Sequence, residues 1–162
     1  MSSSTSHVFV GTSGYNYPEW RGRFYPERCP SARMLELYAQ RFRTVEINAT
    51  FYRMPTPKVV EGWAGQVPPE FRFSLKAPRR ITHDQRLAHC EDAVKVFCET
   101  AGLLGDRLGR LLFQLPPNFK ADETRLRAFL DMLPPGAPVA FEFRHPSWWT
   151  DATYDCLRAR RA

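Results

Sequence analysis

Cysteine and lysine are both scarce in this chain of 162 residues. The four cysteines lie far apart and form no Cys-x-x-Cys pair, which argues against a zinc ribbon or a disulfide framework and predicts thiols packed in the core. They are Cys29, Cys90, Cys98 and Cys156. No run of 18 apolar residues occurs, so no membrane-spanning helix is expected.

The beginning of the chain also lacks the basic and apolar regions of a signal peptide. Residues 1–6 are therefore expected to be a disordered N-terminus, and the protein is predicted to be cytoplasmic. The whole chain is 43% hydrophobic and 14% aromatic, which is typical of a globular chain with a substantial core. Residues 1–162 are predicted to form a single domain.

Positive charge is carried almost entirely by arginine, with 19 arginines against four lysines and a net charge of +6. This excess is compatible with an anionic partner such as a phosphate, a nucleic acid or an acidic substrate. An ordinary solvated surface is the alternative interpretation, because no basic run exceeds a few residues. The longest basic patch inside the body of the chain is 76–80.

Strand-like and helix-like segments alternate five times along the chain. Strands are expected at 7–10, 44–48, 71–76, 110–115 and 139–144, and helices at 31–43, 56–63, 93–101, 122–133 and 152–162. The segments 15–20 and 49–52 are expected to be aromatic loops. This alternation predicts an α/β fold with a parallel sheet and right-handed crossovers.

Two architectures fit this alternation, an open doubly wound sheet and part of a (β/α)8 barrel. A dinucleotide-binding sheet normally shows a glycine fingerprint after its first strand, and Gly11-x-x-Gly14 has the wrong spacing. A barrel fits better, since polar residues alternate with apolar ones and would meet at the carboxyl ends of the strands. A closed barrel typically needs about 250 residues, so this one is expected to be truncated after about five βα units.

Polar groups at the predicted strand ends form the candidate site. The predicted catalytic residues are Glu46, Glu142 and Lys76, and the predicted substrate-binding residues are Tyr15, Asn48, Tyr52, His83, Gln114, Arg144, His145 and Trp148. Carboxylates beside cations and imidazoles suit acid–base or metal-assisted chemistry, as in a hydrolase or an isomerase. The sequence does not identify a cofactor, although a divalent metal is compatible with these residues.

Lys76 and Arg144 would hold an anion, because a guanidinium binds a phosphate or carboxylate through two hydrogen bonds. The alternative is structural. In that interpretation the charged side chains neutralise one another in a network that fills the barrel, because buried charges must be paired.

Several motifs occur together and in order. They are Gly11-Thr12-Ser13-Gly14-Tyr15, 46–52, Phe73-Ser74-Leu75-Lys76 with Ile81-Thr82-His83, 112–117, and 142–148. This set resembles the YecE-like family, also called domain of unknown function 72. The resemblance implies a TIM-barrel-like fold with a polar pocket at the strand carboxyl ends, and it implies no activity. Family members continue through further strands, one with a Tyr-x-Arg-x-His-Gly motif that this sequence lacks, so the chain resembles their N-terminal part.

The predicted function is an enzyme-like barrel domain that binds a small anionic ligand, phosphate-bearing or derived from nucleic acid, at the mouth. The alternatives are a non-catalytic nucleic-acid binder, which uses arginines for phosphates and aromatic rings for stacking, and an inactive fragment. An open five-stranded sheet would leave two unpaired edges. Poor stability, or association with another copy or a partner, is therefore expected.

Overall fold

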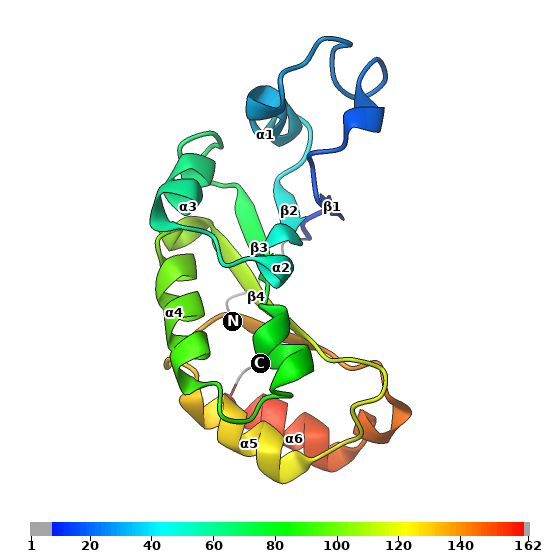
Figure 1. Ribbon diagram of the computed structural model, residues 1–162, viewed down its shortest axis with the longest axis vertical. Helices are drawn as coiled ribbons and strands as arrows, with labels where there is room; N and C mark the ends of the chain where they lie inside the picture. Colours follow the sequence, from blue (N-terminus) through cyan, green and yellow to red (C-terminus); the bar gives the residue numbers. More distant parts are fainter. Residues whose placement is uncertain (1–7, 161–162) are drawn as a thin grey trace, which may run out of the picture.

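A five-stranded parallel sheet forms the centre of the molecule, in a computed structural model that describes residues 8–160 (Figure 1). The predicted disordered N-terminus, 1–6, lies outside the described residues. The strands are β1 (Gly11–Ser13), β2 (Thr44–Ile47), β3 (Arg72–Lys76), β4 (Leu108–Gln114) and β5 (Val139–Glu142). Their spatial order follows the sequence, and each neighbouring pair is parallel.

Helices connect successive strands. They are α1 (Ser31–Ala39), α2 (Ala49–Tyr52), α3 (Pro57–Ala64), α4 (Glu91–Gly102), α5 (Glu123–Met132) and α6 (Asp151–Arg160). Short turns of other helix types occur at η1 (Pro18–Trp20), η2 (Arg80–Asp84), η3 (Gly105–Arg107) and η4 (Pro146–Trp148). The predicted α/β class is confirmed, and strands that follow one another in the sheet through helical crossovers are consistent with a TIM-barrel-like fold.

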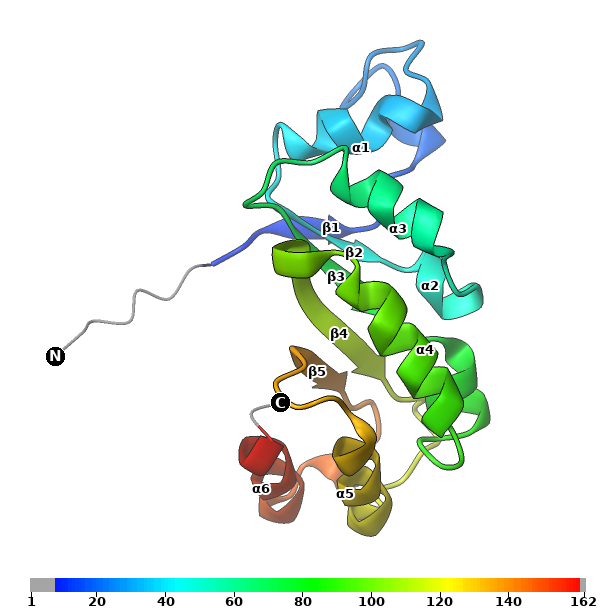
Figure 2. The same cartoon turned by 90° about the vertical axis from the view of Figure 1, so that its left-hand side faces the viewer.

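The helices cover one face of this sheet. Figure 2 shows α3 and α4 alongside the strands, with α1 at one end of this layer and α5 and α6 at the other. Val45, Phe73 and Phe113 point from the strands into this layer and are at most 1% exposed. The Phe113 ring meets Phe129 of α5 edge-on, with 5.0 Å between ring centroids. The core therefore lies between the sheet and its helices, where apolar residues with period 2 meet those with period 3.6.

The first strand lies further along the chain than the apolar pattern predicts. Val8, Phe9 and Val10 are 86%, 44% and 68% exposed, whereas β1 begins at Gly11. The reason is a close approach between β1 and β2. A Cβ atom on residue 11 would lie 2.0 Å from the carbonyl oxygen of Thr44, so glycine permits the pairing.

A buried tyrosine joins β1 to the rest of the domain. The Tyr38 hydroxyl of α1 donates to the Thr44 carbonyl at 2.9 Å and accepts the Thr12 backbone N–H at 2.8 Å. The first strand has only three residues, so this contact supplements a short ladder. A helix side chain thus holds the edge strand in its parallel register.

The opposite face of the sheet is polar. Among residues 8–160, no helix packs over it, and its side chains line an open hollow of about 590 Å³. Glu46, Arg72 and Arg110 contribute to this lining. In the described part of the chain, no helix is long and apolar enough to cross a membrane.

Candidate functional site

Glu142 is held between two donors where β4 and β5 end. The register pairs Gln114 with Glu142, so both side chains lie side by side on the uncovered face. Gln114 Nε2 donates to Glu142 Oε2 at 2.7 Å, and Arg144 Nε donates to Oε1 at 2.8 Å. Each carboxylate oxygen therefore has a fixed partner, and the carboxylate in turn orients the Arg144 guanidinium.

Lys76 ends the neighbouring strand β3 and lies over an aromatic ring. Its Nζ atom is 4.9 Å from the ring centroid of Phe51 in α2, a favourable cation–π distance. The His83 ring meets the same phenyl group edge-on at 4.9 Å. Together, Lys76, Gln114, Glu142, Arg144, Phe51 and His83 form what is called here the mouth cluster.

Thr50 anchors α2 to the strand ends that carry the mouth cluster, and the sequence did not predict this residue. It is 1% exposed, and its hydroxyl lies 2.9 Å from the Ile47 carbonyl and 2.6 Å from the Lys76 carbonyl. These contacts join α2 to the ends of β2 and β3, beside Phe51 (Figure 1). The predicted aromatic loop 49–52 is thus a short helix, and no periodic pattern in the sequence marks Thr50.

Glu46 belongs to a separate group at the ends of β1 and β2. Ser13 Oγ donates to Glu46 Oε1 at 2.7 Å and accepts from Asn48 Nδ2 at 2.6 Å. Strands β3 and β4 lie between Glu46 and Glu142. Three strand spacings, about 14 Å, thus separate their strands, so the two carboxylates do not form one close pair.

The electrostatics of the mouth cluster favour negative charge. Burial alone would raise the pKa of Glu142, but hydrogen bonds from Gln114 and Arg144, with the charges of Arg144 and Lys76, lower it overall. Burial lowers the pKa of His83, and the charges of Arg79 and Lys76 lower it further, against a smaller opposing effect of Asp84. A neutral imidazole and an ionised carboxylate are therefore expected at pH 7.

Several donors in the mouth cluster are unused. Within residues 8–160, the Lys76 ammonium makes no hydrogen bond or ion pair, and Arg144 uses only its Nε atom. His83 Nδ1 lies 2.9 Å from the Thr82 hydroxyl. The Lys76 ammonium and the terminal nitrogens of Arg144 are free to bind an anion, and Arg144 remains 46% exposed.

Besides Asn48, which belongs to the Glu46 group, four of the predicted binding residues lie outside the mouth cluster. Trp148 is fully buried and donates its Nε1–H to the Phe119 carbonyl at 2.8 Å. Tyr15 packs 6.3 Å from the Tyr38 ring, and burial raises its pKa. The remaining two are His145, whose Nδ1 accepts from the Ser147 N–H, and Tyr52, which is 82% exposed. Trp148 and Tyr15 thus act in packing in this structure.

A metal centre does not assemble from the described residues. Between residues 8 and 160, no three His, Cys, Asp or Glu side chains are grouped so as to hold a metal ion. The cysteines are unpaired, as predicted, with three of the four buried. Burial raises the pKa of Cys90 and of Cys98 to about 11, which keeps both thiols protonated at neutral pH.

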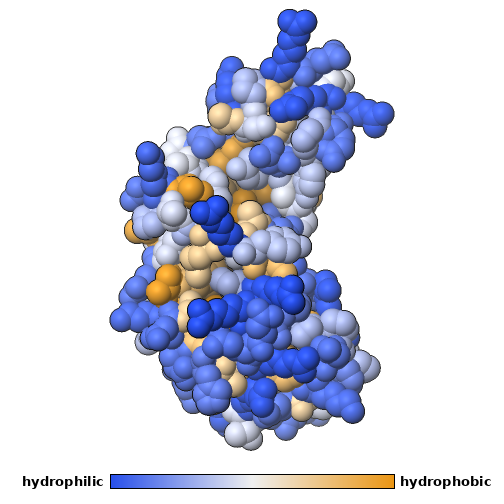
Figure 3. Space-filling view, viewed as in Figure 1, coloured by the Kyte–Doolittle hydropathy of each residue, from blue (hydrophilic) through white to orange (hydrophobic). Residues whose placement is uncertain are grey.

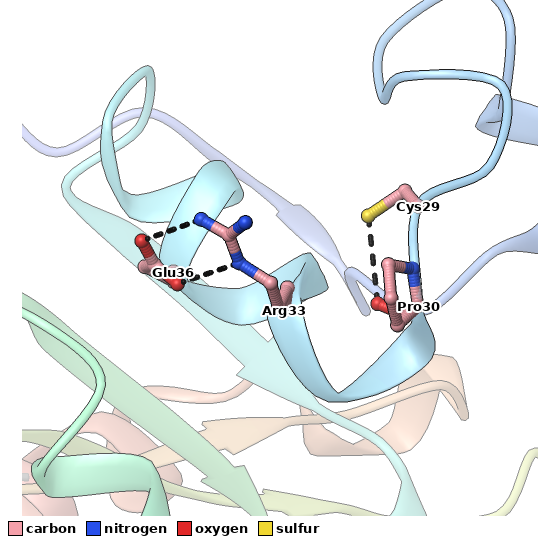
Figure 4. Close-up of polar contacts among 4 residues, drawn as sticks. All are labelled: Cys29, Pro30, Arg33 and Glu36. Carbon is pink, nitrogen blue, oxygen red and sulfur yellow. Dashed lines mark hydrogen bonds and ion pairs between the residues drawn. The ribbon is translucent and has the colours of Figure 1, made fainter.

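Cys29 illustrates the same structural use of a thiol. It is 4% exposed and donates to the Pro30 carbonyl at 3.4 Å (Figure 4). On the solvent side of α1, Arg33 and Glu36 form an ion pair with two contacts of 3.2 Å, and hydrogen bonding from Arg33 lowers the pKa of Glu36. Neither feature faces the mouth cluster, so both serve the packing and solvation of α1.

Comparison with known families agrees with this geometry. The family model described as "Protein of unknown function DUF72" matches residues 9–162. The chain belongs to the DUF72 family. Among its relatives, the UPF0759 protein YecE of Escherichia coli K12 is 35% identical over 143 residues, which cover 88% of this chain and 50% of YecE. The UPF0759 protein YunF of Bacillus subtilis 168 is 29% identical over 157 residues, 91% of this chain and 54% of YunF.

Solved structures of DUF72 proteins share the fold. A family member from Thermotoga maritima MSB8 matches with a TM-score of 0.78 and 32% identity, over 96% of this chain and 63% of that one. A second, from Enterococcus faecalis V583, matches with a TM-score of 0.68 and 22% identity, over 80% and 57%. The chain spans about half the length of YecE and YunF.

A pH-dependent contribution to stability is expected from Glu142. Because its folded pKa lies below the unfolded value of about 4.3, the ionised carboxylate stabilises the fold above that pH, and the effect is lost as pH falls through the folded pKa. Glu142→Gln should therefore be less stable than the parent at pH 7, by less than about 1 kcal/mol because the Arg144 pair is exposed. Urea unfolding from pH 7 to pH 3 measures the difference, which should shrink with acidification. A constant difference would contradict this assignment.

Proposed function

We propose that the mouth cluster binds the anionic group of a small ligand, phosphate-bearing or derived from nucleic acid, in an enzyme-like domain of TIM-barrel type. The observation that carries the proposal is the set of unused donors on Lys76 and Arg144 within residues 8–160. A phosphate group accepts several hydrogen bonds at once, and a guanidinium offers two parallel donors in fixed geometry.

Each group has a defined part in this proposal. Glu142 orients Arg144 and, with its lowered pKa, stays ionised rather than exchanging protons near neutrality. Lys76 supplies a positive charge over the Phe51 ring. Glu46 is the proton-handling group of the enzyme hypothesis. Its Oε1 accepts from Ser13, whereas Oε2 has no hydrogen-bond partner within residues 8–160.

The direct test is a calorimetric titration of the purified chain with ribose 5-phosphate at pH 7. A saturable heat with 1:1 stoichiometry is expected. The affinity for ribose 5-phosphate should fall as the salt concentration rises, because the charges of Lys76 and Arg144 are solvent-accessible. Ribose at the same concentrations is the matched neutral probe and should give no heat. Equal binding of ribose and ribose 5-phosphate would overturn the proposal.

Non-catalytic binding of nucleic acid is the competing function, favoured by the exposed Tyr52 ring beside the arginines at 53, 79 and 80. An eight-residue oligothymidylate distinguishes the two. A pure binder would show log affinity falling with log salt at about 0.7 per neutralised phosphate, with no phosphate released from any probe. In the enzyme hypothesis, Glu46→Gln abolishes turnover of a phosphate ester while ribose 5-phosphate still binds.

A further inference from the structure

A second concave surface adjoins the mouth cluster on the far side of Phe51. We call it the outer groove. It has a volume of about 610 Å³ and lies between α2 with η2 on one side and α4 on the other. Its lining includes Phe51, Tyr52, Arg53, Arg80, Asp92 and Val96. In Figure 3, pale to orange apolar surface lies between α2 and α4, with strongly hydrophilic side chains beside it.

Phe51 is the wall that the groove and the mouth cluster share. Phe51 and Tyr52 are adjacent rings of α2. The Phe51 ring is covered by the Lys76 ammonium at 4.9 Å and meets the His83 ring edge-on. The other, Tyr52, lies 5.1 Å away at an interplanar angle of 87° and is 82% exposed. The two perpendicular rings thus present different faces, Phe51 to the mouth cluster and Tyr52 to solvent.

Charge in the outer groove is unevenly compensated. Arg79 is paired with Asp84 at 3.2 Å. The side chains of Arg53 and Arg80 make no hydrogen bond or ion pair with any residue from 8 to 160, and Asp92 on α4 is the remaining carboxylate. The groove thus has an apolar and aromatic floor with two free guanidinium groups at its border. Such a lining fits a ligand that has an aromatic ring and a negatively charged group.

We propose that the outer groove is a second subsite of the ligand held by the mouth cluster, and that this ligand is a phosphate ester that also carries an aromatic ring, as a nucleotide does. The inference rests on the proposed function. The phosphate binds Lys76 and Arg144, and the aromatic ring lies across Phe51 in the groove, stacked on Tyr52. Arg53 and Arg80 bind a further anionic group of the ligand by donating hydrogen bonds to it. Asp92 accepts hydrogen bonds from amino or hydroxyl groups of the ligand.

Adenosine 5′-monophosphate and ribose 5-phosphate form the probe pair, because they share the sugar phosphate and differ only in the aromatic base. The wild-type chain should bind the nucleotide roughly tenfold more tightly, the effect of one base–aromatic stack. Tyr52→Ala should abolish this difference and leave ribose 5-phosphate unchanged, whereas Tyr52→Phe should keep it. Trp149→Ala removes another exposed aromatic ring, 58% exposed, and should leave both affinities unchanged.

The outcomes separate this inference from the proposed function. Equal affinities of the wild-type chain for the two probes, or a Tyr52→Ala variant that still prefers the nucleotide, would overturn the second subsite while leaving the phosphate site intact. Failure of the chain to bind either probe would overturn the proposed function and the subsite with it. Tyr52→Ala changes a largely exposed side chain, so it should fold as the parent does, which a thermal scan checks.

Discussion

Replacing Trp148 with alanine is expected to lower the free energy of unfolding by about 3–5 kcal/mol, the usual cost of truncating a buried aromatic side chain. Trp148 is completely buried and stacks on Phe143 at 4.8 Å, with Phe119 edge-on at 5.5 Å. The variant also loses the indole hydrogen bond and leaves the Phe119 carbonyl without that donor. Urea unfolding followed by far-UV circular dichroism measures the loss.

The neighbouring tryptophan is the control for this experiment. Trp149 is 58% exposed, so Trp149→Ala should change the free energy of unfolding by less than about 0.5 kcal/mol. The two variants remove the same side chain from adjacent positions and differ only in burial. Similar losses at both positions would contradict the packing role of Trp148 and return it to the ligand-binding residues that the sequence predicted.

Replacing Lys76 with alanine is expected to weaken binding of ribose 5-phosphate by about 10- to 100-fold, because a hydrogen bond to a charged group contributes about 1.5–3 kcal/mol. The ammonium has no ion-pair partner within residues 8–160, so its removal leaves no buried carboxylate uncompensated. Stability should therefore change little while affinity falls, and isothermal calorimetry with a thermal scan of the same sample separates the two effects.

Lys95→Ala provides the matched control, since this lysine lies on the exposed side of α4 away from the mouth cluster. It makes the same change of net charge. Comparable losses of affinity in both variants would mean that ribose 5-phosphate responds to overall charge rather than to the position of Lys76. Retained affinity in Lys76→Ala would remove Lys76 from the phosphate site.

The alternation of apolar and polar residues predicted most strands of the sheet, because the two faces of a strand are set by neighbouring residues in the sequence. Phe73 and Leu75 alternate with Arg72, Ser74 and Lys76, and this period of two survives as buried and polar faces in β3. The first strand was wrong by several residues, since Val8 to Val10 carry the apolar pattern but Gly11 makes the close approach to Thr44. Steric fit between strands is not visible in hydropathy.

Some residues of the candidate site were likewise predictable from the sequence, and others were not. Lys76, Gln114, Glu142 and Arg144 were predicted from their places at strand ends, and the parallel register does bring Gln114 to Glu142. Glu46 and Glu142 were predicted as catalytic residues of one site, yet β3 and β4 lie between their strands. The sequence alone does not give the distance between two carboxylates across the mouth. Thr50 and the outer groove depend on contacts between α2, η2 and α4 that no single segment encodes.

The amino-acid sequence by itself determined the α/β class, the parallel order of elements, the core thiols and the polar strand ends, because each follows from short-range periodicity or composition. Tertiary structure alone decided which polar groups touch, which remain unpaired and which aromatic rings are buried. Trp148 and Trp149 show the reason most directly: they are chemically identical and adjacent, and only long-range packing against Phe119 buries one and exposes the other. Burial depends on what surrounds a residue in space, and residues distant in sequence supply those surroundings.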